Sequence, residues 1–218
     1  MLTRGDLQAP DWGQRYNLTI TNWARLWHLY PDPEIAIAFF GAVEQLLKQS
    51  GTTVFTKSIP ESIVPTEGQI DLIEGIEQVV FVGFPNGVWD SVNALPILRS
   101  GTTATPFSID FENKPRFLID ASVFGGSSGS PVIIFDPNFR RVDANNRVMG
   151  EGTLYLAGII GSAYFWENQN EIVERYIPTQ QSQVANVREM IDLGIVYKSH
   201  LIRDFTDVLL AADKPLAD

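Results

Sequence analysis

The apolar positions of this sequence fall into short runs separated by turn-forming residues, and this texture is clearest after residue 76. Six runs are rich in β-branched and aromatic residues, as strands are. They are Gln78–Phe84, Ile97–Thr103, Arg116–Asp120, Pro131–Phe135, Leu156–Tyr164 and Leu193–Tyr197. Six short strands joined by turns are what a small antiparallel barrel needs, so we expect an all-β barrel from residue 77 to residue 198.

Residues 1–76 hold fewer strand-like runs and resemble only part of a second barrel. The runs are Tyr16–Trp23, Arg25–Tyr30 and Glu34–Phe40. Ala42–Gln49 has helical spacing and ends before a glycine, and Thr66 followed three residues later by Gln69 predicts a capped helix start ahead of Ile70–Ile76.

Residues 199–218 are expected to form a C-terminal helix and tail. Between Ser199 and Ala212 one apolar stripe recurs at helical spacing, so the helix should dock on the barrel. The stripe is Leu201, Ile202, Phe205, Val208 and Leu209. Gln181–Asp192 also has apolar residues at helical spacing, at Val184, Val187 and Ile191.

Composition narrows the class of protein without naming its function. The chain has 218 residues, 44% of them hydrophobic, with a net charge of −10 and no cysteine. The acidic balance disfavours nucleic acid as a partner. Without a run of 18 apolar residues we expect no membrane span, and without a signal-peptide pattern or cysteine we expect a cytoplasmic protein. Because Walker, dinucleotide and zinc-binding patterns are absent, we expect no cofactor and no metal.

The segment that carries chemistry is Phe124–Val132, FGGSSGSPV. Its glycines and proline crowd one tight turn between two apolar runs, and glycine freely takes the backbone angles that such a turn requires. A serine held there gains an oxyanion hole from its own N–H and that of the residue two before it. These groups belong to Ser128 and Gly126.

The sequence Gly126–Pro131 resembles the G-x-S-G-[GS]-P nucleophile motif of chymotrypsin- and trypsin-like serine peptidases. With a serine directly after its second glycine, the motif resembles that of the bacterial glutamyl-endopeptidase branch of the family. Three other segments resemble family elements in the right order. They are Val82–Gly87 (VGFPNG), ahead of the nucleophile, Leu156–Ser162, a strand that pairs with substrate backbone, and Leu193–Phe205, the last strand and helix.

The resemblance covers residues 78–212 well and residues 16–50 loosely. It implies a complete C-terminal chymotrypsin-like barrel, a partial N-terminal barrel, and a serine endopeptidase that hydrolyses peptide bonds through Ser128. It also implies a specificity pocket built from residues before the nucleophile and from the later strand. The implied pocket residues are Ser122, Phe124, Ser162, Ala163 and Tyr164.

The base and acid that would activate Ser128 are not evident. A serine hydroxyl needs a neighbouring base, and that base needs an orienting carboxylate. His28 lies too close to the acid's strand for the family order, and His200 follows the serine. The acid position falls on Glu34 in one register and on Ala36 in another, which we slightly favour.

Two explanations of the missing histidine stay open. Either the histidine-bearing segment precedes residue 1, or the protein has lost it and is an inactive or impaired scaffold. A pseudoprotease that binds a protein partner is therefore the alternative function. An unclosed half-barrel leaves strand edges open, which predicts a homo-oligomer or a complementing chain.

Two segments also partly match the motifs of other kinds of site. G-x-S-x-G at Gly125–Gly129 also fits the nucleophile elbow of α/β-hydrolases, but that elbow must lead into a helix and a β run follows here. The acidic and amide side chains of Asp136, Asp143, Asn145 and Asn146 lack the spacing of a calcium loop, so we expect a polar hairpin.

Overall fold

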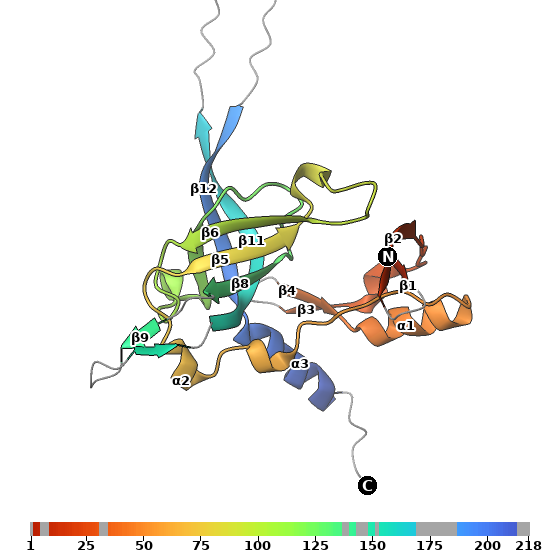
Figure 1. Ribbon diagram of the computed structural model, residues 1–218, viewed down its shortest axis with the longest axis horizontal. Coiled ribbons are helices and arrows are strands. Elements are labelled where there is room, and N and C mark those ends of the chain that lie inside the picture. Colours follow the sequence, from red (N-terminus) through yellow and green to blue (C-terminus); the bar gives the residue numbers. More distant parts are fainter. Residues whose placement is uncertain are drawn as a thin grey trace, which may run out of the picture.

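Six antiparallel strands close into a barrel in the computed structural model, which describes residues 2–4, 9–30, 35–136, 140–142, 148–150, 153–168 and 187–212. Around the barrel the order is β11-β12-β7-β6-β5-β8 (Figure 1). These strands are β5 (Gln78–Gly83), β6 (Ile97–Thr103), β7 (Arg116–Asp120), β8 (Pro131–Asp136), β11 (Thr153–Asn168) and β12 (Val187–Lys198). The predicted all-β barrel is confirmed; its chymotrypsin-like identity stays a prediction.

Alternating side chains fill the barrel. On β5, Val79 and Phe81 point inward and are almost completely buried, while Gln78 is exposed. Each fully buried side chain of this size contributes about 1.5–3 kcal/mol. The core includes Phe107, Phe117, Ile119, Val132, Ile134, Ala157, Ile160 and Val196. Five of the six apolar runs of the sequence therefore share one core, and the sixth, Ile97–Thr103, closes the barrel without contributing a side chain to that core.

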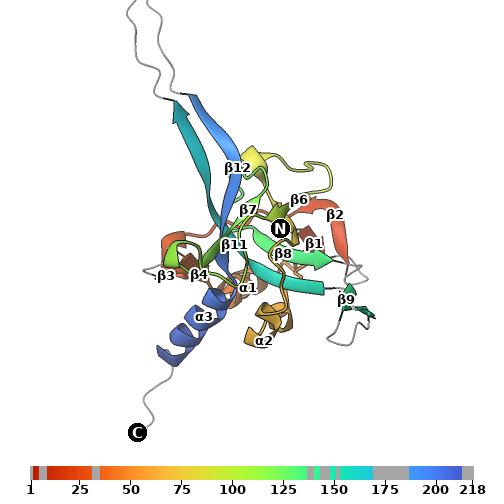
Figure 2. The same cartoon turned by 90° about the vertical axis from the view of Figure 1, so that its left-hand side faces the viewer.

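The β11–β12 hairpin is longer than its sequence pattern predicted. The two strands pair from Gly158↔Lys198 out to Asn168↔Val187, and both views show them projecting beyond the barrel (Figure 2). From residue 187 onward, the helical spacing within Gln181–Asp192 is misleading, because these residues pair with β11 as a strand. The rest of that segment lies outside the described residues.

The first portion of the chain forms two separate two-stranded sheets and a helix. β1 (Leu2–Arg4) pairs with β2 (Pro10–Arg15), and β3 (Trp27–Tyr30) pairs with β4 (Ile35–Ala38). Helix α1 spans Phe40–Gln49, in agreement with its pattern. That these elements belong to a partial N-terminal barrel stays a prediction.

The predicted strand at Tyr16–Trp23 is wrong. Residues 16–20 lie in no regular element, and a 3-10 turn, η1 (Trp23–Leu26), follows. Asn22 takes a left-handed conformation, with φ of 61°. The left-handed residue and the turn after it end the extended run, and residues 16–20 pair with no strand among the described residues.

Short helices connect the two portions. They are η2 (Glu61–Ile63) and α2 (Glu67–Ile70). The predicted capping box is confirmed, because the Thr66 N–H donates to the Gln69 side chain at 2.9 Å. The helix nevertheless ends at Ile70, so Ile70–Ile76 is not helical as a whole. Elsewhere, η3 covers Pro85–Gly87, η4 Phe111–Asn113, β9 Arg140–Val142 and β10 Val148–Gly150.

Helix α3 (His200–Ala212) packs against the molecule through one face (Figure 1). Leu201 and Phe205 are buried, and the Phe205 ring lies 4.9 Å from the ring of Tyr30. Val208, which the sequence placed on the same stripe, is exposed. In the part of the chain that the structure describes, no helix combines the length and apolar character that crossing a bilayer requires.

Candidate functional site

The motif Phe124–Ser130 forms two consecutive turns that lead into β8. The Ser127 N–H donates to the Phe124 carbonyl at 3.0 Å, and the Ser130 N–H donates to the Ser127 carbonyl at 3.0 Å. Gly126 and Gly129 take φ angles of +87° and +82°, which favour glycine. Because a strand follows the turn, the α/β-hydrolase elbow is wrong.

Neighbouring strands and loops anchor this turn on both sides. The Gly129 N–H donates to the Ile160 carbonyl at 2.7 Å, and the Ile160 N–H donates to the Ser130 carbonyl at 3.0 Å. On the other side, the Asn86 N–H donates to the Gly125 carbonyl at 2.6 Å. The VGFPNG segment singled out in the sequence therefore lies against the nucleophile motif.

Ser128 is exposed, and its side chain lies next to β11. The hydroxyl Oγ donates to the carbonyl oxygen of Gly161 at 3.1 Å. The ring of Tyr197 lies so close to Gly161 that it leaves no room for a Cβ atom at that position. The residue whose carbonyl receives the Ser128 hydroxyl therefore has to be glycine while the ring stays in place.

Two backbone amides of the turn are left without acceptors. Among the described residues, neither the Gly126 N–H nor the Ser128 N–H donates to another group. A Cβ atom on Gly126 would overlap the Phe84 carbonyl oxygen, so only glycine fits at this close approach. Free amides flanking an exposed hydroxyl are the donors that stabilise a tetrahedral oxyanion.

The predicted pocket residues lie on the two segments that meet at Ser128. Ser122 and Phe124 are half-buried on the segment that enters the turn. On β11, Ser162 is exposed and Ala163 and Tyr164 are half-buried, directly after the carbonyl that Ser128 contacts.

Sequence reasoning missed Arg99 of β6. Its guanidinium carbon lies 4.8 Å from the centre of the Phe124 ring. A contact of this kind, between a strand and a distant loop, leaves no signal in the sequence, because residues 99 and 124 are far apart along the chain.

Neither histidine contacts the Ser128 hydroxyl. His28 is exposed on β3, and its ring lies edge-on to the Phe39 ring at 5.5 Å. His200 is half-buried at the start of α3, where burial lowers the pKa of its imidazole. Within the described ranges, the only hydrogen bond of that hydroxyl is the one to Gly161.

Among the described residues, the acid position also provides no carboxylate partner for a histidine. Ala36 lies on β4 opposite Leu29 and is exposed. Glu34, the other register, lies outside the described residues. Residues 35–38 therefore bring no carboxylate to the strand.

The described residues contain no group of three or more histidine, cysteine, aspartate or glutamate side chains that could hold a metal ion. Asp143, Asn145 and Asn146 lie outside the described residues, and Asp136 ends β8.

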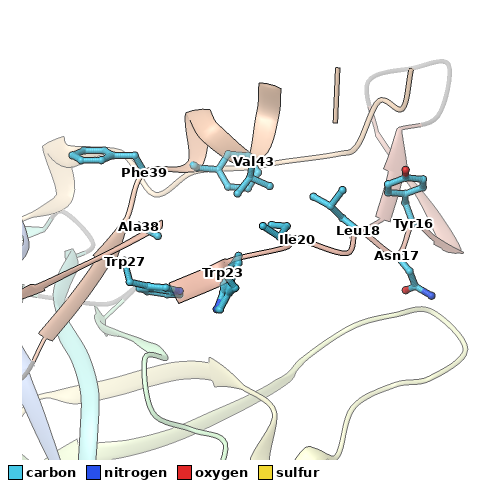
Figure 3. Close-up of a pocket in the computed structure, with 10 residues that line it drawn as sticks. Tyr16, Asn17, Leu18, Ile20, Trp23, Trp27, Ala38, Phe39 and Val43 are labelled. Carbon is cyan, nitrogen blue, oxygen red and sulfur yellow. The ribbon is translucent and has the colours of Figure 1, made fainter. Parts of the chain in front are cut away.

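An apolar cavity of about 500 Å³ lies in the first portion of the chain. Figure 3 shows Val43 of α1 facing Ile20 across it, with Trp23 and Trp27 at one end. The remaining lining residues are Tyr16, Asn17, Leu18, Ala38, Phe39 and Phe40. Trp23 and Trp27 meet edge to face at 5.5 Å and stay partly exposed.

Comparison with known proteins gave no match to a family model, a curated protein or a solved structure.

Proposed function

We propose that the chain is a trypsin-like serine endopeptidase scaffold whose nucleophile is Ser128, impaired unless a base is supplied. One observation carries the proposal: an exposed hydroxyl belongs to a glycine turn in which the N–H groups of Gly126 and of Ser128 itself are unpaired among the described residues. The hydrogen bond to Gly161 ties that hydroxyl to β11.

Strand β11 offers an edge for substrate. It pairs with β12 from Gly158 to Asn168, but its pairing with β8 ends at Ile159↔Pro131. Past Ile160, which bonds to the nucleophile turn, the other edge has no partner strand among the described residues. An extended peptide would add a strand there, beside Ser162 and Ala163, and bring its carbonyl carbon to Ser128.

The reaction is acyl transfer. A base takes the Ser128 proton, the Oγ–carbon bond forms, and the carbonyl oxygen becomes an oxyanion held by the Gly126 and Ser128 amides. The carbon–nitrogen bond then breaks as the proton passes to the leaving amine. Water attacks the acyl-enzyme by the same route and frees Ser128 and the acid product.

The described residues supply no base that contacts the Ser128 hydroxyl. No imidazole contacts the hydroxyl, and removal of one member of a catalytic triad lowers rates by orders of magnitude. We therefore expect slow chemistry at Ser128 that an added base accelerates.

Fluorophosphonate labelling with and without free imidazole tests the proposal. Labelling should map to Ser128 by peptide mass and should accelerate at least about tenfold with imidazole, since a positioned base contributes about 10²–10⁴-fold. The Ser128→Ala variant should not label. Ser58→Ala, at an exposed serine in an irregular segment, is the matched control and should label as the parent does.

Absence of labelling at Ser128 in both conditions would overturn the peptidase proposal. Equal labelling of Ser128→Ala and the parent would do the same, because the reactive group would then lie elsewhere.

A second candidate is a protein-binding module, and the apolar cavity favours it. Trp27 and Leu29 share one face of β3, and both side chains are exposed, Trp27 by 37% and Leu29 by 77%. Binding of an apolar extended peptide should change tryptophan fluorescence, weaken in Trp23→Ala, and persist in Ser128→Ala. Saturable binding without any Ser128 labelling would favour this function over the first.

A further inference from the structure

Arg99 carries a positive charge that no described residue neutralises. Its guanidinium lies between the rings of Phe81, at 5.8 Å, and Phe124, at 4.8 Å. The Nη1 atom is shielded from solvent and has no hydrogen-bond partner. Aromatic faces attract the cation but offer only weak acceptors for its N–H groups. Arg99 as a whole is half-buried, but a shielded N–H without an acceptor is costly, and an anion would supply both the acceptor and the opposite charge.

Ser127 presents a second unpaired group in the same turn as the proposed nucleophile. The residue is 1% exposed, and its hydroxyl, like Arg99 Nη1, is buried without a hydrogen-bond partner among the described residues. A hydroxyl can donate to an anion while its neighbour supplies the charge. Two unpaired donors are therefore found in one part of the molecule.

Both donors belong to the same end of the barrel. Arg99 pairs with Phe81 across β5 and β6, so the two side chains share the inner face. Gly83 is the next inward position after Phe81 on β5, about 6.6–6.8 Å along the strand. Ser127 lies next to this position, because its Cα atom is 3.7 Å from the point that a Cβ on Gly83 would occupy. Phe124 joins them, since it contacts Arg99 and accepts the Ser127 N–H.

We propose that Arg99 and Ser127 bind one small monovalent anion, a halide or a carboxylate, at the inner end of the barrel beside the nucleophile turn. The guanidinium supplies the charge and Nη1–H, and the Ser127 hydroxyl supplies a second hydrogen bond. Water would satisfy hydrogen bonds but not the charge. The site does not depend on peptidase activity.

Thermal unfolding of the whole chain tests the proposal, with chloride exchanged for bulky isethionate at constant ionic strength. The Tm should rise by about 5–10 °C as free chloride passes from below its Kd to about 100-fold above it. Arg99→Met should lose this dependence, and Ser127→Ala should need at least about fivefold more chloride. Arg25→Met, at an exposed arginine, is the matched control and should keep the full response.

Two additions keep the test decisive. Acetate in place of chloride distinguishes the source: tighter binding of acetate assigns a carboxylate, and tighter binding of chloride a halide. If Arg99→Met fails to fold, anomalous scattering from bromide-soaked crystals decides instead, with a peak expected within hydrogen-bond distance of Arg99 Nη1 and Ser127 Oγ.

A Tm that is independent of chloride and acetate would overturn the site. So would an unchanged chloride response in Ser127→Ala, because the anion would then not be shared, or a bromide-soaked crystal without a peak at this place.

Discussion

Replacing Gly126 by alanine should lower the free energy of unfolding more than a methyl group added at any other glycine of the nucleophile turn. The residue has φ of +87°, where an L-residue costs about 1–2 kcal/mol relative to glycine. The new Cβ would also overlap the Phe84 carbonyl oxygen, which belongs to the backbone and moves only with its loop. Such overpacking costs about 1–3 kcal/mol more, so we expect a loss of about 2–5 kcal/mol.

Gly129→Ala is the matched control for this prediction. Gly129 has nearly the same φ, +82°, but no heavy atom lies within 4 Å of its Cβ position. It should lose only the backbone contribution of about 1–2 kcal/mol. Urea unfolding followed by tryptophan fluorescence measures both free energies of unfolding. If the two variants lose equal stability, the close approach of Phe84 to Gly126 is refuted.

Three other perturbations follow from contacts outside the turn. Gly161→Ala should lower the free energy of unfolding by about 1–3 kcal/mol, because its Cβ meets the Tyr197 ring. The double variant with Tyr197→Ala should lose less than the sum of the two single losses, and strict additivity of the free energies from urea unfolding would contradict the contact. Asp110→Ala should destabilise the protein more than Lys198→Met, by about 1 kcal/mol or more, because it leaves a buried ammonium unpaired: the Lys198 side chain is 5% exposed and bonds to the half-exposed Asp110 at 2.6 Å. The reverse order of urea midpoints would count against a buried ammonium. Burial lowers the pKa of His200 below its ordinary 6.5, so its contribution to stability is complete above pH 6.5 and declines as the pH falls below that value. The urea midpoint of His200→Gln should therefore fall less steeply below pH 6.5 than that of the parent, and identical slopes would show that burial does not perturb the imidazole.

Much of the barrel was predictable because local patterns and tertiary structure agree there. Runs such as Arg116–Asp120 and Ile97–Thr103 match the observed strands residue for residue. Their β-branched and apolar side chains sit between turn residues, and both strands belong to the closed barrel, whose core includes Phe117 and Ile119. Patterns of this kind carry their own boundaries.

The misses have identifiable physical causes. Residues 16–20 alternate like a strand, yet they line a cavity, and the left-handed Asn22 follows. Val187 and Ile191 have helical spacing, but pairing with β11 decides their conformation. In each case an interaction with a distant segment outweighs the local pattern.

The candidate site was predictable only where it is local. The turn at Gly126 and Ser128 could be read from its glycines and its flanking β runs. Contacts made across the sheet, such as Arg99 on Phe124 and Tyr197 on Gly161, could not, because nothing in a single sequence pairs those positions.

The convergence of the turn's amides on one point is tested most directly by the crystal structure of the phosphonylated protein. The proposal predicts a phosphorus–oxygen bond to Ser128 Oγ, with one phosphoryl oxygen about 2.7–3.1 Å from both the Gly126 and the Ser128 nitrogens. A phosphoryl oxygen directed into solvent, or bound to only one of these amides, would contradict it.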